Sequence, residues 1–479
     1  MEQDKVPHVV ILPLPLSGHV KPMLSLAELL CDAGFLIITF VNSDYNHDRL
    51  ERVMDIQAFY NRSPGFRFVS ISDGLPLDQP RLGPIILQLF FNTRTVSKPL
   101  FREILISLRQ STERSPPTCI IADGLMCFAI DVAEELGVPI ITFPTHGSHG
   151  MWTIMHTSNL IEEGEVPFQE ESDMDKPITS IPGMESLLRR RDLPGNCRLE
   201  VENPLIKFII SEASAMKRAS TLILNTFEEL EAPIIARLGS FFDKVYAIGP
   251  LHALLKTRIK DSSQPVSSFG SLRKEDSSCM EWLNSQPLKS VIYVSFGSVV
   301  ELSRDQLIEF WHCLVNSRKP FLWVVRPDLI EGNEELGQIS EEIEQGTKER
   351  GYMVSWAPQE EVLAHPSVGG FLTHSGWNST LESIFEGVPM ICWPQAADQQ
   401  VNGRCVSELW RVGFDMKDTC DRFIIEKMVR NLMEDKSEEI MRSTNEIARM
   451  ARGSVKENGS SHCNLERLIE DLRLMSLTN

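Results

Sequence analysis

The amino-acid sequence predicts an α/β protein with two Rossmann-like domains in tandem. Three observations support this prediction: the length of the chain, a recurring alternation of strand-length apolar segments with helix-length segments, and one interruption of that alternation. At 479 residues the chain is about three times as long as the commonest single domain, so two domains are expected. Hydrophobic residues make up 42% and charged residues 24%, which is the composition of an ordinary globular protein.

The first half of the chain contains recurring apolar segments of strand length. Segments that are apolar throughout, rather than alternating, are typical of parallel strands covered by helices on both faces. They span residues 9–14, 36–41, 66–70, 118–122, 139–143, 222–225 and 245–248. Alternation of such strands with helices indicates a doubly wound sheet.

A linker is predicted where the alternation stops, because residues 255–278 offer little that could form a core. The alternation resumes with segments at 291–296, 321–325, 352–355, 370–373 and 390–393. We therefore expect an N-terminal domain at 1–250, a linker at 251–280, a C-terminal domain at 281–455 and a final helix at 456–479 that packs back on the N-terminal domain. Ligands of open parallel sheets bind beyond the carboxyl ends of the strands, so the active site is expected in a cleft between the two facing domains.

The charge and the apolar pattern exclude some partners. With 47 basic and 66 acidic residues, the formal charge of −19 repels nucleic acids and anionic membrane surfaces. The sequence has no apolar window long enough to cross a membrane and begins with charged residues, so no stable membrane insertion is expected. The 10 cysteines are scattered without a C-x-x-C pair, as in proteins of a reducing compartment. We expect a cytoplasmic monomer.

The most informative stretch spans residues 356–399. Within it, a strand ending at 371–373 leads into a turn that opens a helix reaching about Glu386. Such a turn presents backbone N–H groups and the positive end of the helix dipole to a diphosphate. Gly376 permits close approach of the ligand, and His374 adds a hydrogen-bond donor.

Two flanking features suit a base and a sugar. The indole of Trp356 can stack on a flat base, and Asp398 with Gln399 offers acceptors and donors for sugar hydroxyls. Taken singly, these features also have ordinary structural explanations: a buried Trp, a hydrogen-bonded His, and a helix capping box formed by Ser379 and Glu382. The combination is much harder to explain in that way.

A second set of candidates lies in the N-terminal domain. His19 follows the first strand and opens a helix, and Asp123 directly follows the strand at 118–122. Both side chains should emerge at the same edge of the sheet, where a carboxylate beside an imidazole suits a general base. The alternatives are a structural His and a helix N-cap Asp.

Three histidines follow the strand at 139–143, namely His146, His149 and His156. They invite a zinc interpretation, but no nearby Cys or acidic residue completes a tetrahedral set of ligands. No metal site is therefore predicted.

The stretch 356–399 resembles the plant secondary-product signature of the family-1 UDP-dependent glycosyltransferases, which have the GT-B fold of two Rossmann-like domains. The resemblance spans nearly the whole chain. Outside the signature it rests on His19 and on segments 181–183, 192–194, 291–298, 321–328 and 459–461.

The resemblance implies roles for individual residues. For the donor it implies contacts with uracil (Trp356, Ala357), ribose (Gln359, Glu382), diphosphate (Ser298, His374, Asn378, Ser379) and the transferred sugar (Trp377, Asp398, Gln399). For the acceptor it implies that His19 removes the proton, that Asp123 orients His19, and that His146, His149 and Trp152 line the pocket. The family commonly has Cys at position 375, where this chain has Ser375; we expect little effect, because the contact there is largely through the backbone.

The function implied is inverting transfer of glucose from UDP-glucose to a hydroxyl or carboxyl of a small lipophilic plant metabolite, giving a β-glucoside. UDP-glucose is then a co-substrate, and no cofactor or metal ion is required, because the helix N-terminus and His374 stabilise the leaving diphosphate. Terpenoid or iridoid alcohols and acids, phenolics and cyanohydrins all remain open as acceptors, with overall similarity favouring terpenoids.

Two rival functions are weighed against this one. A non-catalytic binding protein would keep the nucleotide site but has no need of His19 and Asp123. A glycosidase would need a matching pair of carboxylates, and the sequence offers none. The P-loop, the dinucleotide-binding and the nucleophile-elbow motifs are also absent from the sequence.

Overall fold

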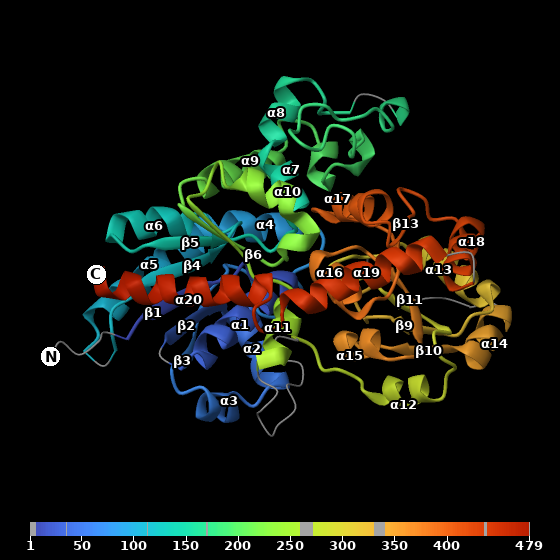
Figure 1. Ribbon diagram of the computed structural model, residues 1–479, viewed down its shortest axis with the longest axis horizontal. Helices are drawn as coiled ribbons and strands as arrows, with labels where there is room; N and C mark the ends of the chain where they lie inside the picture. The colour runs from blue at the N-terminus through green and yellow to red at the C-terminus, as the bar shows by residue number, and fades with distance from the viewer. Residues whose placement is uncertain are drawn as a thin grey trace. The chain divides into compact units, whose positions relative to one another are not determined.

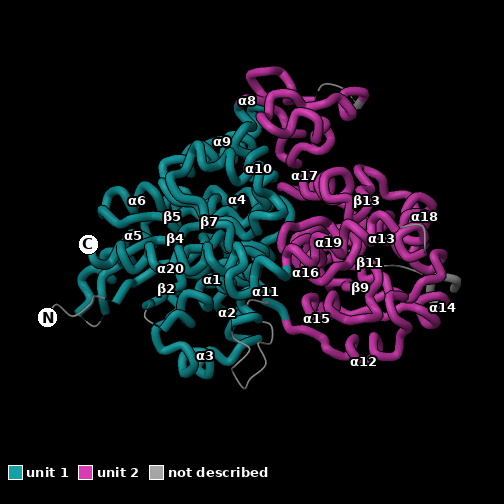
Figure 2. Tube along the Cα trace, viewed as in Figure 1, with its two compact units in different colours: residues 1–158, 201–273, 452–479 teal, residues 159–200, 274–451 magenta. Residues whose placement is uncertain are grey.

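The computed structural model describes residues 6–34, 36–112, 114–168, 171–258, 272–329, 341–434 and 438–478. The chain forms two compact units (Figure 2). Unit 1 comprises Met1–Ser158, Val201–Arg273 and Arg452–Asn479, and unit 2 comprises Asn159–Glu200 and Lys274–Ala451.

Unit 1 is built on a seven-stranded sheet in the order β3-β2-β1-β4-β5-β6-β7 (Figure 1). All of its neighbouring strands pair in parallel. The strands are β1 (His8–Leu12), β2 (Ile37–Ser43), β3 (Phe66–Ile71), β4 (Cys119–Asp123), β5 (Ile140–Phe143), β6 (Thr221–Leu224) and β7 (Lys244–Ala247).

The strands of unit 1 are buried on both faces. Every residue of β1 and β4 is buried, which requires helices on either side of the sheet. On one face, Val10 and Leu12 of β1 share a core with Phe101, Phe128 and other residues of the covering helices. The helices are α1 (Ser17–Asp32), α2 (Asp44–Val53), α3 (Ile56–Arg62), α4 (Ile85–Asn92), α5 (Lys98–Gln110), α6 (Phe128–Leu136), α7 (Ser148–Met155), α9 (Pro204–Met216), α10 (Glu228–Leu238), α11 (Leu251–Arg258) and α20 (Ser460–Thr478), while α8 (Thr157–Glu162) begins in unit 1 and ends in unit 2.

Unit 2 contains a six-stranded parallel sheet in the order β10-β9-β8-β11-β12-β13. This is the 3-2-1-4-5-6 order of a dinucleotide-binding Rossmann fold. The strands are β8 (Val291–Ser295), β9 (Phe321–Val324), β10 (Gly351–Val354), β11 (Val368–Thr373), β12 (Met390–Cys392) and β13 (Gly413–Asp415). The helices are α12 (Ser278–Asn284), α13 (Arg304–Ser317), α14 (Glu341–Arg350), α15 (Gln359–Ala364), α16 (Trp377–Glu386), α17 (Gln399–Arg404), α18 (Arg422–Met433) and α19 (Glu438–Ser454), the last running from unit 2 into unit 1.

A strand forms at or beside each of the predicted segments, which confirms the expected α/β class of tandem Rossmann-like domains. The sequence analysis missed β13, which has only three residues and includes Asp415. So short a strand carries no apolar run that a pattern search could detect. It exists because Gly413 lies against Met390, where a β-carbon would collide with the Met390 carbonyl oxygen.

The division into units differs from the boundaries expected from the sequence. Residues 159–200, which we had placed within the N-terminal domain, group with unit 2, and polar contacts of this segment reach Arg404 in α17 and Asp418 after β13. The expected linker at 251–280 begins with α11, which has buried Leu251, Leu254 and Leu255 and belongs to unit 1. Residues 259–271 of that linker lie outside the described residues.

The final helix, α20, belongs to unit 1 and packs beside β7. Asn464 Nδ2 donates to the Ala247 carbonyl at 3.0 Å, and Lys244 forms an ion pair with Asp471 at 2.7 Å.

All ten cysteines are free thiols, and most of them are buried. Among the described helices, none combines the length and the apolar character needed to cross a membrane.

Candidate active site

In unit 1, the two strands at the point where the strand order reverses carry the predicted catalytic pair. His19 lies in the first turn of α1, which follows β1, and Asp123 ends the neighbouring strand β4. His19 Nδ1 is 2.7 Å from Asp123 Oδ2. The other carboxylate oxygen, Oδ1, accepts the Leu125 N–H at 2.9 Å, which fixes the orientation of the carboxylate. The structure therefore brings these two residues together.

A third residue, Thr145, completes the surroundings of His19 Nδ1. Its hydroxyl oxygen lies 2.8 Å from that nitrogen. Because Nδ1 faces both Asp123 and Thr145, it is the nitrogen expected to carry the proton, and the second nitrogen, Nε2, is then the one able to accept a proton. The sequence analysis did not single out Thr145, although it follows β5, the strand next to β4.

The three predicted acceptor contacts lie in different surroundings. The His146 ring stands edge-on to that of His19, with centroids 6.2 Å apart. His149 is buried on α7 and bonds through Nδ1 to Glu231 Oε1 at 2.7 Å. Trp152 is buried against His156, with ring centroids 4.3 Å apart. The ring of His146 is thus in contact with that of His19.

Glu231 anchors the start of α7. Its carboxylate accepts the backbone N–H groups of Ser148 at 2.9 Å and His149 at 3.1 Å. Burial alone would raise the pKa of this carboxyl, but the hydrogen bonds from His149 and Ser148 outweigh that effect and hold the pKa below its usual value. An ionised Glu231 thus fixes the helix that follows Thr145 and His146.

In unit 2, His374 stands at the corresponding reversal of strand order, between β8 and β11. Two glycines make room for its ring: a β-carbon on Gly297 would lie 2.5 Å from His374 Cε1, and one on Gly376 would also collide with the ring. Gly376 has an ordinary φ of −60°, so this packing is what requires glycine there. Burial, assisted by the charge of Arg326, lowers the pKa of His374 to about 4. The imidazole is therefore a neutral hydrogen-bond donor at physiological pH.

Arg326 holds the turn after β8. Its side chain is buried and donates to the carbonyl oxygens of Ser298 and Val300. Ser298, a predicted diphosphate contact, is therefore held through its backbone. Residues 321–328 are part of the family resemblance. The structure shows why this segment contains a buried arginine: Arg326 binds two carbonyl groups of the turn after β8.

The helix α16 begins at Trp377, with Gly376 as its N-cap residue. The capping box considered for Ser379 and Glu382 is not what the structure shows, because Ser379 lies inside the first turn of the helix. Instead, Gln359 Nε2 donates to Ser379 Oγ at 2.8 Å and to Glu382 Oε2 at 2.6 Å. The structure therefore joins these three predicted donor-binding residues in one hydrogen-bonded cluster.

The loop between β10 and α15 carries the predicted base-binding residues. Trp356 is half-buried, and its carbonyl oxygen accepts the Asp276 N–H at 2.9 Å, while Ala357 is buried. Gln359, in the first turn of α15, links this loop to the cluster with Glu382. Trp356 and Gln359 are close in the sequence, so a base stacked on Trp356 and a ribose at Gln359 could belong to one bound nucleoside.

The predicted sugar-binding residues lie after β12. Gln399 Oε1 accepts the N–H groups of Gln395 at 2.9 Å and Ala396 at 3.0 Å, so the amide carbonyl is occupied and the NH₂ group is what Gln399 can offer a sugar. Asp398 Oδ2 accepts Asn402 Nδ2 at 2.9 Å, and the same nitrogen donates to the Ser375 carbonyl at 3.0 Å. Asn402, which the sequence analysis missed, thereby connects this loop to the turn that precedes α16.

Two further donor-binding predictions concern Trp377 and Asn378, the first two residues of α16. Trp377 is buried, and its ring centroid lies 6.1 Å from that of Trp410. Asn378 is partly buried in the first helical turn, where an anion at the helix N-terminus would be within its reach.

Within the described residues, no group of three or more His, Cys, Asp or Glu side chains is placed to hold a metal ion.

The fold and these two sets of residues point to a nucleotide-dependent transferase: one doubly wound domain offers a turn at a helix N-terminus, which suits an anion, and the other offers a histidine hydrogen-bonded to a carboxylate. Comparison with known proteins specifies the class. Residues 266–447 match the family model described as UDP-glucoronosyl and UDP-glucosyl transferase.

Similar proteins cover nearly the whole chain. The 7-deoxyloganetic acid glucosyltransferase of Catharanthus roseus is 49% identical over 476 residues, covering 98% of each chain. The 7-deoxyloganetin glucosyltransferase of the same plant is 41% identical, also over 98% of each chain. The crystal structure of Os79 from O. sativa in complex with UDP has 27% identity and a TM-score of 0.81, covering 97% of this chain and 100% of the other.

The chain therefore belongs to the UDP-glucuronosyl and UDP-glucosyl transferase family. The expected GT-B fold class and the expected enzyme class, a UDP-glucose-dependent glucosyltransferase, are both confirmed.

The packing of His374 against Gly297 yields a direct prediction. Gly297→Ala places a methyl group 2.5 Å from the His374 ring at a backbone φ of 69°, so the affinity for UDP, measured by calorimetry, should fall by about tenfold or more. Gly137→Ala is the matched control, because Gly137 has a similar φ of 62° and open space around its Cα. Equal UDP affinities in the two variants would contradict the role given to the His374 packing.

Proposed function

We propose that this enzyme transfers glucose from UDP-glucose to an oxygen of a small terpenoid acceptor, with inversion at the anomeric carbon. The observation that carries the proposal is the hydrogen bond of 2.7 Å between His19 and Asp123 at the carboxyl edge of the unit 1 sheet. It directs Nδ1 of the imidazole towards a carboxylate and leaves Nε2 as the nitrogen that can act as a base.

The chemistry follows from these positions. His19 Nε2 takes the proton of the acceptor hydroxyl as the oxygen attacks the anomeric carbon, and Asp123 stabilises the imidazolium that forms. UDP leaves from the opposite face, so one displacement converts the α-linked donor into a β-glucoside. An acceptor that carries a carboxylate needs less help from the base, because its oxygen is already ionised at neutral pH.

The donor is assigned to unit 2. Trp356 and Ala357 would hold uracil, and the cluster of Gln359 with Glu382 would hold the ribose. The diphosphate would bind at the turn made by Ser298, His374, Asn378 and Ser379, and glucose would bind at Trp377, Asp398 and Gln399. In support, hydrogen bonds join Gln359 with Ser379 and Glu382, and Asp398 with Asn402.

The acceptor is assigned from relatives and chemistry together. Two similar proteins act, by their names, on 7-deoxyloganetic acid and 7-deoxyloganetin. We therefore place the acceptor among iridoid-type terpenoids, with His146 beside His19 as its nearest polar contact and with His149 and Trp152 as further contacts. The product is a sugar ester if a carboxyl reacts and an O-glucoside if a hydroxyl reacts.

We further propose that catalysis needs no metal ion, that the enzyme is a monomer and that it works in the cytoplasm. The neutral His374 and the N-terminus of α16 supply the donors that a leaving diphosphate requires. The ten free cysteines suit a reducing compartment.

One assay tests this function. The purified protein is incubated with UDP-glucose and 7-deoxyloganetic acid in excess EDTA, and the product is identified by mass spectrometry and by the anomeric proton coupling. We expect a β-glucoside and full activity in EDTA. UDP binding without turnover would favour a binding protein, and activity restored only by Mg²⁺ would refute the metal-independent mechanism.

The role of the catalytic pair can be tested separately. His19→Ala should lower kcat for a hydroxyl acceptor by about 10²–10⁴-fold while leaving UDP affinity nearly unchanged, because the base acts on the acceptor proton alone. Asp123→Asn should be milder, and a carboxylate acceptor should partly rescue both variants. His47→Ala, on α2 of the same unit, is the control. His19→Ala retaining more than about a tenth of wild-type kcat would exclude the general-base role.

The choice of sugar gives another prediction. Gln399→Glu keeps an oxygen for the Gln395 and Ala396 N–H groups but removes the amide donors, so kcat/KM for UDP-glucose should fall by about 10- to 100-fold with little change in UDP affinity. Gln395→Glu introduces the same charge in the same loop and should be nearly silent. Wild-type enzyme should prefer UDP-glucose to UDP-galactose, whose axial 4-hydroxyl leaves a polar partner unpaired. A wild-type ratio at or below one would refute the donor assignment.

A further inference from the structure

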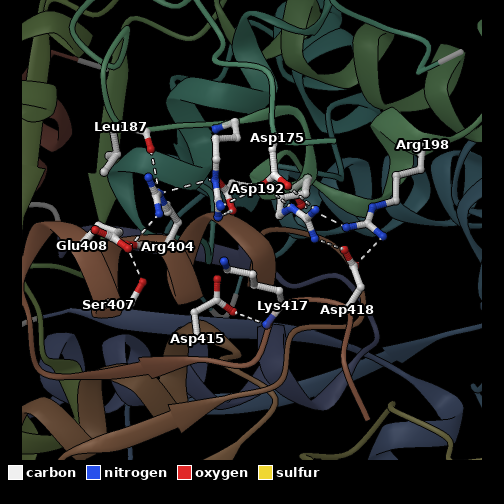
Figure 3. Close-up of polar contacts among 12 residues, drawn as sticks. Asp175, Leu187, Asp192, Arg198, Arg404, Ser407, Glu408, Asp415, Lys417 and Asp418 are labelled. Atoms are coloured by element: carbon white, nitrogen blue, oxygen red, sulfur yellow. Dashed lines mark hydrogen bonds and ion pairs between the residues drawn. The ribbon is translucent and has the colours of Figure 1, made fainter. Parts of the chain in front are cut away.

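Residues 187–198, which we call the brace, lie against the sugar-binding part of unit 2. The brace belongs to the segment 159–200, which groups with unit 2 although unit 1 precedes and follows it in the sequence. Its polar contacts reach three places: the loop before α17, the end of α17 and the turn after β13. Figure 3 shows Arg404 between Leu187, Asp192 and Glu408, and Arg198 directed towards Asp418.

The first contact is with the loop that carries Asp398. The Gly195 N–H donates to the Ala397 carbonyl at 3.3 Å. Ala397 has a φ of 55°, a left-handed conformation that is unfavourable for a residue with a β-carbon and has to be held by its surroundings. A β-carbon added at Gly195 would come within ordinary van der Waals contact of Ala396 Cα, at 3.5 Å, so the brace runs close to this loop. The brace thus touches the loop where its backbone is strained.

The second contact is with the end of α17, five residues after Gln399. Arg404 Nε donates to the Leu187 carbonyl at 2.8 Å and lies 3.4 Å from Asp192 Oδ2. Asp192 is almost fully buried and is fixed by Arg189, which donates to both carboxylate oxygens at 2.8 Å. Ion pairs with a buried, well-oriented carboxylate are screened less by solvent than surface ion pairs. Arg404 is therefore held at the brace by one hydrogen bond and one partly buried ion pair.

The third contact lies beyond β13. Asp418 forms ion pairs with Arg191 at 3.1 Å and with Arg198 at 2.7 Å. Asp415 accepts the Lys417 N–H at 2.8 Å, which orders the turn that presents Asp418. These groups are partly exposed, so this contact is weaker than the one at Arg404.

We propose that the brace positions the loop 395–399 for recognition of the transferred sugar, with Arg404 and Asp192 as positioning residues. This inference rests on the proposed donor site. The brace holds the loop directly at Ala397 and indirectly through α17 at Arg404, so both ends of the Asp398-Gln399 pair are fixed by it. The proposed uracil contacts lie in the loop before α15, and the proposed ribose contacts lie on α15 and α16. The brace makes none of the contacts described above with these three parts.

The test separates binding of the nucleotide from use of the sugar. Arg404→Met keeps the apolar stem and removes both brace contacts. We expect UDP affinity within about twofold of wild type, a roughly tenfold lower kcat/KM for UDP-glucose, and a smaller ratio of UDP-glucose to UDP-galactose activity. Arg404→Lys keeps the charge without the Nε donor and should lie in between. Arg411→Met, which removes an exposed arginine paired with Glu439 in the same unit, should behave as wild type.

A second variant guards against misfolding of Arg404→Met. Asp418→Asn breaks the partly exposed ion pairs with Arg191 and Arg198. It should raise the KM for UDP-glucose about threefold without lowering the affinity for UDP. The positioning role would be overturned if the folded variants kept the wild-type kcat/KM and KM for UDP-glucose. It would also be overturned if UDP affinity and kcat/KM for UDP-glucose fell in parallel. Failure of the wild-type protein to bind UDP would instead refute the donor site itself, so the two hypotheses fail in different ways.

Discussion

The ring of His374 can stand at the end of β11 because Gly297 and Gly376 lack a β-carbon. The rest of the proposed donor site is built around this packing. It fixes the turn that opens α16, and Arg326 holds the facing turn after β8 by binding the Ser298 and Val300 carbonyls. The Ser375 carbonyl in turn accepts Asn402, which also holds Asp398. Side-chain hydrogen bonds of Arg326 and Asn402 thus connect the turn around His374 with the turn after β8 and with the loop that carries Asp398.

The sequence was most informative where function coincides with the end of a strand. His19 and Asp123 could be paired from sequence alone, because neighbouring parallel strands bring their carboxyl ends to one edge of the sheet. The same reasoning located His374 after β11. The predicted strands were recovered because buried parallel strands are apolar throughout, and this pattern depends little on what surrounds them.

What the sequence could not predict depends on contacts between distant segments. Thr145 reaches His19 across 126 positions, and although Thr145 follows the strand next to β4, the sequence does not show that its hydroxyl lies within hydrogen-bonding distance of the imidazole. The carbonyl of Gln399 is occupied by backbone N–H groups of its own loop, which changes the residue from a donor and acceptor into a donor. The strand β13 and the grouping of residues 159–200 with unit 2 also arise from tertiary contacts, which local patterns do not encode.

The boundaries of the units have a consequence for protein engineering. The chain passes between units at residues 158–159, 200–201, 273–274 and 451–452. A chimera of two relatives could be joined at a single junction in the linker in order to exchange sugar specificity. Such a chimera would take the loop 395–399 from one relative and the brace, which contacts Ala397 and Arg404, from the other. Recombination should instead transfer residues 159–200 together with residues 274–451, so that the two segments of unit 2 come from the same relative.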